Sequence, residues 1–240
     1  MNIKKIHYDV CDSTNTRAKE YLRQNDVDRL IVTADMQTGG RGRQGKSFYS
    51  PDKTGVYMTY CFKAALPICS AVAVTTYAAA AVCRALEKVC KRDFSIKWVN
   101  DIYKDGKKVC GILAENIIDA TTGETKHIII GVGINLSTKY FPDDIKDTAA
   151  SIDFDDKQKI IDAIIKQLGL MAKSPLDRSF MDYYRARSIV LGKEIICIRD
   201  EKEQKAYVIE IDNDGGLLVQ YTNGTKEILN SGEISLKLND

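Results

Sequence analysis

The sequence predicts an α+β fold: a mixed, mainly antiparallel sheet packed with helices, followed by a small C-terminal β-barrel or sandwich. Several short segments in the N-terminal part alternate apolar and polar residues, as half-buried strands do. Two longer segments, 70–91 and 157–172, have the composition or spacing of helices that pack on a sheet. After residue 192 the chain changes to short strand-like segments separated by glycine-containing turns. We therefore predict two domains, residues 1–190 and 191–240.

The first predicted elements are a strand, a helix and two further strands. Residues 4–10 alternate weakly as a strand, and Asp12 to Asn15 then precede a helix that runs to about Arg23. Oxygen-bearing side chains at this place usually cap a helix, because they accept the amide protons of its first turn. The alternative is that these hydroxyls and the amide face a ligand. Residues 30–34 and 56–62 have the pattern of strands.

The stretch between those two strands, residues 37–48, holds four glycines and three cations. Glycines let a backbone approach a ligand closely, and arginine side chains suit phosphate or carboxylate. The stretch therefore predicts a flap over an anionic ligand, with a solvated basic hairpin loop as the alternative. Gly40 to Gly45 spell the dinucleotide fingerprint G-x-G-x-x-G, which requires a helix directly after it. A strand follows instead, so we exclude a Rossmann site.

Residues 96–116 predict two strands joined at Asp105-Gly106, a strong hairpin signal. The first strand carries the only tryptophan, Trp98, which we expect in the core. The second begins with Lys107 and Lys108. Lys108 lies inside the strand, so we expect it, and not Lys107 at the turn, to point inward.

Residues 127–136 predict a buried strand in which Gly131 and Gly133 lie on the same face. The missing side chains either leave a slot for a flat ligand or allow close packing against the alanine-rich helix at 70–91. Asn135 has the same parity, which places an amide beside the slot.

The remaining segments predict packing elements. Helices are expected at 157–172 and 176–187, and neither carries an evident chemical group. Five short strands are expected at 193–198, 206–212, 215–221, 225–229 and 233–238.

Composition excludes several classes of function. The net charge is only +2, from 35 basic and 33 acidic residues, which argues against nucleic-acid binding through bulk charge. The seven cysteines form no Cys-x-x-Cys pair, as expected in a reducing cytosol, and the two histidines predict no metal site. No signal peptide or membrane span is evident, and no helix-turn-helix fits before Ser13. We therefore expect a cytoplasmic protein that binds neither membrane nor DNA.

Six motifs, taken together and in order, resemble those of the biotin protein ligases. They are Ser13-Thr14-Asn15, Gln37 with Gly40-Arg41-Gly42-Arg43-Gln44-Gly45, Lys97-Trp98-Val99-Asn100-Asp101, Lys108-Val109-Cys110-Gly111-Ile112-Leu113 with Glu115, Gly131-Val132-Gly133-Ile134-Asn135, and Gly232-Glu233-Ile234-Ser235-Leu236. The resemblance covers nearly the whole chain. It implies the biotin/lipoate ligase catalytic fold with an SH3-like C-terminal barrel, of the single-function type without a DNA-binding domain.

The resemblance also implies a reaction in two steps. Biotin and ATP, with Mg²⁺, give biotinyl-5′-AMP, and a lysine of a biotin carboxyl carrier protein domain then takes the biotinyl group. A homodimer is left open. The alternatives are a lipoate or octanoate ligase or transferase, and a non-catalytic biotin-binding sensor.

Residue roles come from the same resemblance. The biotin-binding residues would be Ser13, Thr14, Asn15, Gln37, Gly40, Arg41, Gly42, Arg43, Lys108, Gly111, Gly131 and Gly133. The ATP-binding residues would be Arg41, Arg43, Phe48, Asn100, Lys108 and Asn135. The catalytic residues would be Lys108 between biotin and the α-phosphate, Arg43 on the adenylate, and Asp101 beside the incoming lysine. Relatives often have proline at Val99, tryptophan at Phe48 and arginine at Lys46.

Overall fold

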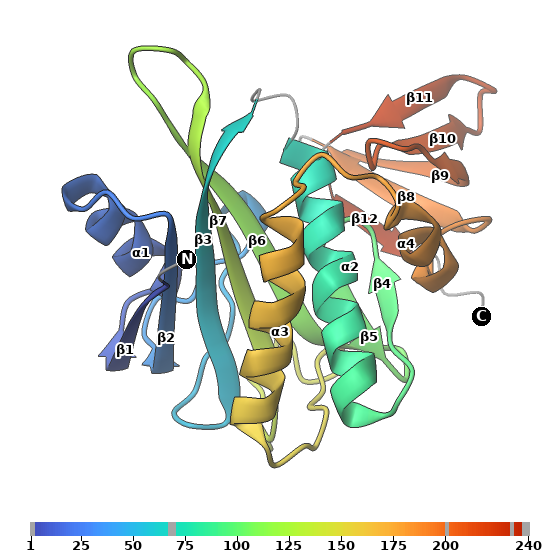
Figure 1. The fold of residues 1–240 in the computed structure, drawn as a ribbon. Coiled ribbons are helices and arrows are strands. Elements are labelled where there is room, and N and C mark those ends of the chain that lie inside the picture. Colours follow the sequence, from blue (N-terminus) through green and yellow to red (C-terminus); the bar gives the residue numbers. More distant parts are fainter. Residues whose placement is uncertain (1–2, 67–70, 200–201, 231–232, 237–240) are drawn as a thin grey trace.

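The computed structural model describes residues 3–66, 71–199, 202–230 and 233–236. Outside these residues lie Cys69, which is one of the seven cysteines, Ser70 at the start of the predicted helix, Gly232 of the last motif, and the end of the last predicted strand, 237–238. The described part contains two sheets and four α-helices (Figure 1). The α+β prediction is therefore confirmed.

The larger sheet has seven strands in the order β1-β2-β3-β7-β6-β5-β4. They are β1 (Lys4–Cys11), β2 (Arg29–Gln37), β3 (Gly55–Leu66), β4 (Ser95–Lys97), β5 (Asp101–Lys104), β6 (Lys107–Ile118) and β7 (Thr125–Asn135). Only β1 and β2 pair in parallel; all the other pairs are antiparallel. The β5–β6 turn has positive φ at Asp105 (50°) and Gly106 (77°), as the hairpin signal predicts.

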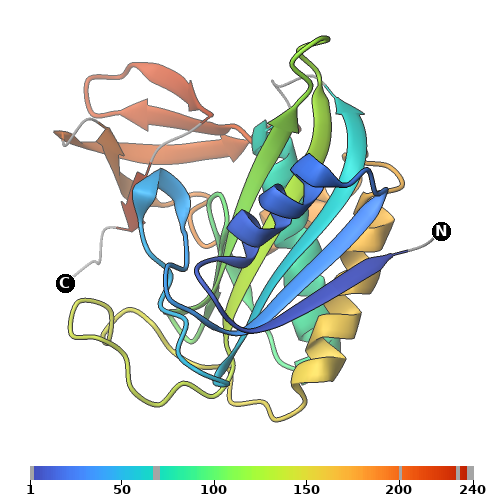
Figure 2. The same cartoon turned by 90° about the vertical axis from the view of Figure 1, so that its left-hand side faces the viewer.

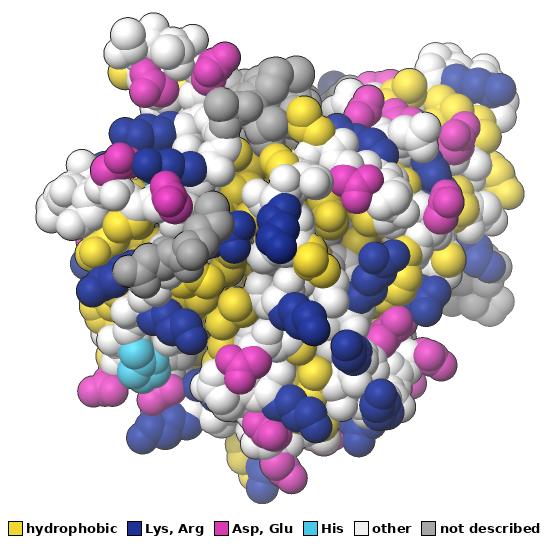
Figure 3. Space-filling model, viewed as in Figure 1, with side chains coloured by type: hydrophobic (Ala, Val, Ile, Leu, Met, Phe, Trp, Pro, Cys, Tyr) yellow, Lys and Arg dark blue, Asp and Glu magenta, His cyan; other side chains and the backbone are white. Residues whose placement is uncertain are grey.

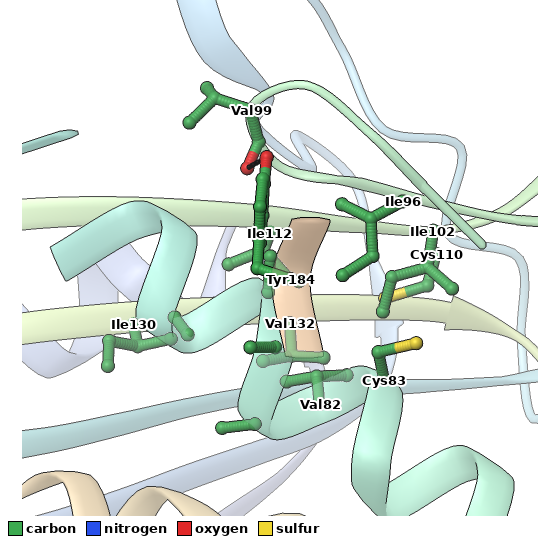
Figure 4. Packing of buried hydrophobic residues seen from close by; sticks show 14 of the residues in the cluster. Val82, Cys83, Ile96, Val99, Ile102, Cys110, Ile112, Ile130, Val132 and Tyr184 are labelled. Atoms are coloured by element: carbon green, nitrogen blue, oxygen red, sulfur yellow. Dashed lines mark hydrogen bonds between the residues drawn. The ribbon is translucent and has the colours of Figure 1, made fainter. Parts of the chain in front are cut away.

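Helices α2 (Ala71–Cys90) and α3 (Lys157–Met171) cover one face of this sheet (Figure 1). Their apolar side chains form the main core with the strands. Figure 4 shows Val82 and Cys83 of α2 among buried residues of the sheet, with Val132 and Cys110 nearby. A fully buried valine or isoleucine contributes about 1.5–3 kcal/mol. The cluster that includes this face is the larger of the two clusters of buried residues, so it holds most of the apolar stabilisation.

Helix α1 (Thr14–Gln24) lies on the opposite face (Figure 2). Ala18 and Leu22 pack there against Leu30, Val32 and Ile129. The helix is short. The stretch after β2 lies beside it, and the long segment after β7 loops out below it (Figure 2). A single short helix with loops covers a sheet face incompletely, and the cavity described below lies here.

The smaller sheet is antiparallel throughout, in the order β11-β10-β9-β8-β12, and fits an SH3-like domain. Its strands are β8 (Glu194–Arg199), β9 (Lys202–Ile211), β10 (Leu217–Tyr221), β11 (Lys226–Leu229) and β12 (Glu233–Leu236). Trp98 Nε1 donates to Gly215 O at 2.8 Å, so the core tryptophan also joins the two sheets. The division into residues 1–190 and 191–240 stays a prediction.

The helix predicted from residue 176 is shorter than expected, because α4 spans only Met181–Arg187. Asp177 accepts hydrogen bonds from the backbone N–H and the hydroxyl of Ser179, both at 2.8 Å. Such local side-chain bonds compete with helical ones and hold a turn before α4.

The surface around α2 and α3 mixes basic and acidic side chains, in keeping with the small net charge (Figure 3). Within the described ranges, none of the helices has both the length and the apolar character needed to cross a bilayer. Six cysteines in the described ranges have free thiols, and all six are buried: Cys11, Cys61, Cys83, Cys90, Cys110 and Cys197.

Candidate functional site

A cavity of about 360 Å³ opens on the α1 side of the larger sheet. Thirteen of the residues predicted to form the site line it: Ser13, Thr14, Asn15, Gln37, Arg41, Gly42, Phe48, Asn100, Asp101, Lys108, Gly111, Gly131 and Gly133. A smaller cavity of about 90 Å³ shares part of this wall and is lined by Arg43. Gly40 and Asn135 line neither cavity.

The start of α1 forms the polar end of the cavity. Ser13 is the residue before the helix, but its side chain makes no capping hydrogen bond, so the capping interpretation is wrong for this residue. Gln37 Oε1 instead accepts from the Thr14 N–H at 2.8 Å. Ser13, Thr14 and Asn15 are all buried and line the cavity, as the alternative interpretation expects.

Two residues without a predicted role, Thr59 and Glu115, fix the position of Asn15. Thr59 Oγ1 lies 2.6 Å from Asn15 Oδ1, and Asn15 Nδ2 donates to Glu115 Oε2 at 2.8 Å. Lys19 Nζ donates to the other carboxylate oxygen at 2.6 Å. Burial alone would raise the pKa of Glu115, but the hydrogen bonds from Lys19 and Asn15 bring it below its ordinary value. The sequence signal that could have identified Thr59 is a threonine on the buried face of a central strand.

The glycines of β6 and β7 face this side of the sheet. A Cβ on Gly131 would overlap the amide group of Asn15, and a Cβ on Gly133 would overlap the ring of Phe48. Gly111 lies against the same ring, whose nearest atoms would be 3.3 Å from its Cβ. The alternative of close packing against the alanine-rich helix is therefore wrong, because the nearest atoms belong to α1 and the 37–48 stretch.

The glycine-arginine stretch folds as a small hairpin, with a bridge between Arg41 and Ser47. Gln44 (φ 53°) and Gly45 (φ 75°) lie at its tip, where positive φ favours glycine. One 3₁₀ turn, Arg43–Gly45, is followed by β3 without an intervening α-helix. The structure thus confirms that this fingerprint is not a Rossmann site.

Charged and amide side chains gather at the opposite end of the cavity. Lys108 Nζ lies 2.8 Å from Asp101 Oδ1, as an ion pair. The angles of this contact do not fit a hydrogen bond, so it is an ion pair and not a well-aligned hydrogen bond. Arg43 Nη1 donates to Asn100 Oδ1 at 3.2 Å, and Asn100 Nδ2 donates to Ile112 O at 2.8 Å. Both cations therefore have acidic or amide partners that a ligand would compete with.

The segment after β7 also reaches the cavity, which the sequence did not predict. Lys108 N donates to Thr148 O at 2.8 Å, and Ala150 N donates to Lys108 O at 2.9 Å. Thr148 and Ile145 line the cavity, and Ile234 of the smaller sheet lines the adjacent one. Lys108 points inward and Lys107 is exposed, as predicted. Asn135 Nδ2 donates to Ala150 O at 3.2 Å, so it supports this segment from outside the cavity.

One cluster of candidate metal ligands occurs within the described ranges: His7, Asp9 and Asp35, with ligand atoms within 4.8 Å of one another. It is largely exposed, and Asp35 already pairs with Lys157 at 2.9 Å. None of the three lines the cavity.

Comparison with known proteins agrees with the site geometry. Residues 8–135 match the Biotin/lipoate A/B protein ligase family, and residues 190–237 match the Biotin protein ligase C terminal domain. The bifunctional ligase/repressor BirA of Bacillus subtilis is 31% identical over 241 residues, which cover 96% of this chain and 73% of BirA. The biotin–[acetyl-CoA-carboxylase] ligase of Paracoccus denitrificans is 25% identical, over 93% of this chain and 96% of that protein.

Among solved structures, the biotin protein ligase of Aquifex aeolicus in complex with biotin and ATP superimposes with a TM-score of 0.75. Its sequence is 27% identical, and the match covers 98% of both chains. The two family matches leave residues 1–7, 136–189 and 238–240 outside them, and the fold agrees along nearly the whole length. The chain therefore belongs to the biotin/lipoate A/B protein ligase family, and its smaller sheet forms a biotin protein ligase C-terminal domain.

Proposed function

We propose that the chain joins biotin to ATP, giving biotinyl-5′-AMP and pyrophosphate, and transfers the biotinyl group to a lysine of a biotin carboxyl carrier protein. The family match and the named ligase relatives support an enzyme of this class. The similar Aquifex structure holds both biotin and ATP, which supports these two molecules as substrates.

The observation that carries this proposal is that one cavity has two chemically different ends. Buried hydroxyl and amide groups at the start of α1 form one end, and Lys108 with Asp101 and Asn100 forms the other. A substrate with a neutral polar head and a carboxylate tail fits this arrangement. The carboxylate would then lie beside the cation at which a phosphate must also bind.

We assign the chemistry to the charged end. Lys108 would bind both the biotin carboxylate and the α-phosphate, which fixes the geometry of attack and stabilises the charge that develops there. Arg43 would hold the adenylate. When Lys108 moves to the phosphate, Asp101 would be released from its present ion pair and could orient or deprotonate the incoming lysine. Phe48 and Asn100 would serve the nucleotide.

Mg²⁺ belongs to the proposal as the counterion of the ATP phosphates. Mg²⁺ is commonly bound by one or two carboxylates together with substrate phosphates. Among the described residues, Asp101 is the one carboxylate that lines the cavity, and Asn100 adds an amide oxygen. These residues fit a metal that arrives with the nucleotide and neutralises phosphate charge.

The direct test is the mass of a carrier domain after incubation with this protein, ATP and either biotin or lipoate. A mass increase corresponding to one biotinyl group, with none from lipoate, is expected. Preferential lipoyl transfer would favour the lipoate ligase alternative. Biotin binding without pyrophosphate release would indicate a non-catalytic sensor. The absence of DNA binding and the oligomeric state stay predictions to be measured separately.

A further inference from the structure

Tyr184 of α4 is fully buried in the main core, and its hydroxyl reaches the 98–100 turn between β4 and β5. The hydroxyl donates to the carbonyl oxygen of Val99 at 3.1 Å, and Figure 4 shows Tyr184 pointing toward Val99. Val99 is only 3% exposed, so water cannot readily replace this donor. Burial raises the pKa of Tyr184, so the phenol keeps its proton at neutral pH and remains a donor.

The 98–100 turn leads into the charged end of the cavity. Asn100 is its last residue and Asp101 begins β5 directly after it, and both line the cavity. The backbone carbonyl of Asn100 accepts an N–H of β6 at 3.1 Å, which holds one residue of the turn. The bond from Tyr184 holds the preceding residue, Val99. Tyr184 therefore bonds to the turn beside two residues of the site, although it lines neither cavity.

Helix α4 is itself fixed in place, so Tyr184 offers its hydroxyl at a defined position. Directly after the helix, Ser188 forms a bridge with Ile96 of β4, and Ile189 N donates to Ile96 O at 3.0 Å. Within the helix, Arg185 Nε donates to the last carbonyl of β9 in the smaller sheet at 2.8 Å. The hydroxyl is thus anchored to β4, the strand that runs into the turn.

We propose that Tyr184 is a positioning residue, whose hydroxyl holds the 98–100 turn and so keeps Asn100 and Asp101 in the geometry that the reaction needs. The inference rests on the proposed function, because these two residues have their assigned roles in that reaction. An unpaired buried carbonyl is costly. Without the hydroxyl, the turn would therefore shift until Val99 O reached another donor or water.

Such a shift would spread through the charged end of the cavity. Arg43 Nη1 donates to Asn100 Oδ1 at 3.2 Å, and Lys108 Nζ lies 2.8 Å from Asp101 Oδ1. Both cations would move with their partners, and a misplacement of about 1 Å can slow a reaction about 100-fold. The start of α1, at the other end of the cavity, is held by separate hydrogen bonds and should keep its geometry.

The variant Tyr184→Phe removes the donor and leaves the ring that packs in the core. We expect the single-turnover rate of biotinyl-AMP formation, at saturating biotin and ATP, to fall about tenfold. The affinity for biotin, measured by titration calorimetry, should stay within about threefold of wild type, because the start of α1 is unchanged. Loss of rate without a matching loss of biotin affinity distinguishes positioning from general destabilisation of the site.

The matched control is Tyr183→Phe, which removes the same atom from the neighbouring residue of α4. Tyr183 donates to Glu87 Oε2 of α2 at 2.8 Å, and neither of these residues lines the two cavities of the site. The Tm of this variant should fall, since a bond to a carboxylate is lost. Its rate of biotinyl-AMP formation should nevertheless stay within about twofold of wild type, because the 98–100 turn keeps its donor.

Incorporation of para-aminophenylalanine at position 184 keeps an N–H donor on the same ring and should preserve the rate within about threefold of wild type. Three results would overturn the inference: a wild-type rate in Tyr184→Phe, an equal loss of rate in Tyr183→Phe, or a loss of about tenfold with the amino analogue. The last result decides the question even if Tyr184→Phe does not fold. Failure of the wild-type protein to form biotinyl-AMP would instead refute the proposed function itself.

Discussion

Replacing Gly131 by alanine tests the close contact between β7 and the start of α1. The new methyl group would lie no more than 3.0 Å from three side-chain atoms of Asn15, so this side chain must leave its place. It would lose its bonds to Glu115 and Thr59. A bond to a charged group contributes about 1.5–3 kcal/mol and a neutral one about 0.5–1.5 kcal/mol, which gives a loss of about 2–4.5 kcal/mol.

For a domain of this size, that loss corresponds to a fall in Tm of about 4–18 °C, measurable by calorimetry. Biotin affinity should fall in parallel, since Asn15 lines the cavity. The matched control is Gly111→Ala, whose methyl group would have the Phe48 ring at 3.3 Å and the Lys108 chain at 3.4 Å as its nearest neighbours. These side chains can move by a few tenths of an ångström. If Gly131→Ala keeps the Tm of Gly111→Ala and binds biotin normally, the assigned contact is wrong.

Four further outcomes are expected. Lys108→Ala should slow biotinyl-AMP formation at least about 100-fold in single-turnover assays, because the cation at the reacting centre is lost; wild-type rates would contradict its role. Arg43→Gly should release reactive adenylate and label bystander proteins, and labelling at the wild-type level would count against it. His127 is buried, and burial lowers its pKa below the ordinary 6.5. The unfolded state therefore binds more protons at acidic pH, so Tm should decrease as the pH is lowered from 6.5, and His127→Gln should make Tm depend less on pH. Trp98→Phe should leave Gly215 O without its donor and destabilise the protein by about 1–3 kcal/mol in denaturant titrations.

Sequence patterns predicted the elements, because hydrophobic periodicity and turn signals are local properties. The hairpin at Asp105-Gly106 and the inward Lys108 are examples. The resemblance to the biotin protein ligases, and not a local pattern, predicted most of the residues that line the cavity. The two glycines of β7 were predicted to share a face, and they do. Which neighbour each glycine accommodates depends on how α1 packs across the sheet, which no local pattern contains.

The polar network was beyond prediction for the same reason. Asn15 bonds to residues 44 and 100 positions away, and Gln37 bonds to a helix start 23 positions away. The local preference of Ser13 for capping was overridden by this tertiary contact. Thr59 looked like an ordinary strand residue, and Glu115 had a place in a motif but no role. Only the register of β3, β6 and β7 brings them together.

The position of Trp98 gives the protein a built-in optical probe. It is the single tryptophan of the chain, it is 4% exposed, and its indole N–H donates to a carbonyl in the turn between β9 and β10 of the smaller sheet. It also lines the small cavity beside Arg43. Intrinsic emission therefore comes from one site at the junction of the two sheets. A shift of that emission toward the red would record separation of the sheets, and quenching on nucleotide addition would record occupancy, without any attached dye.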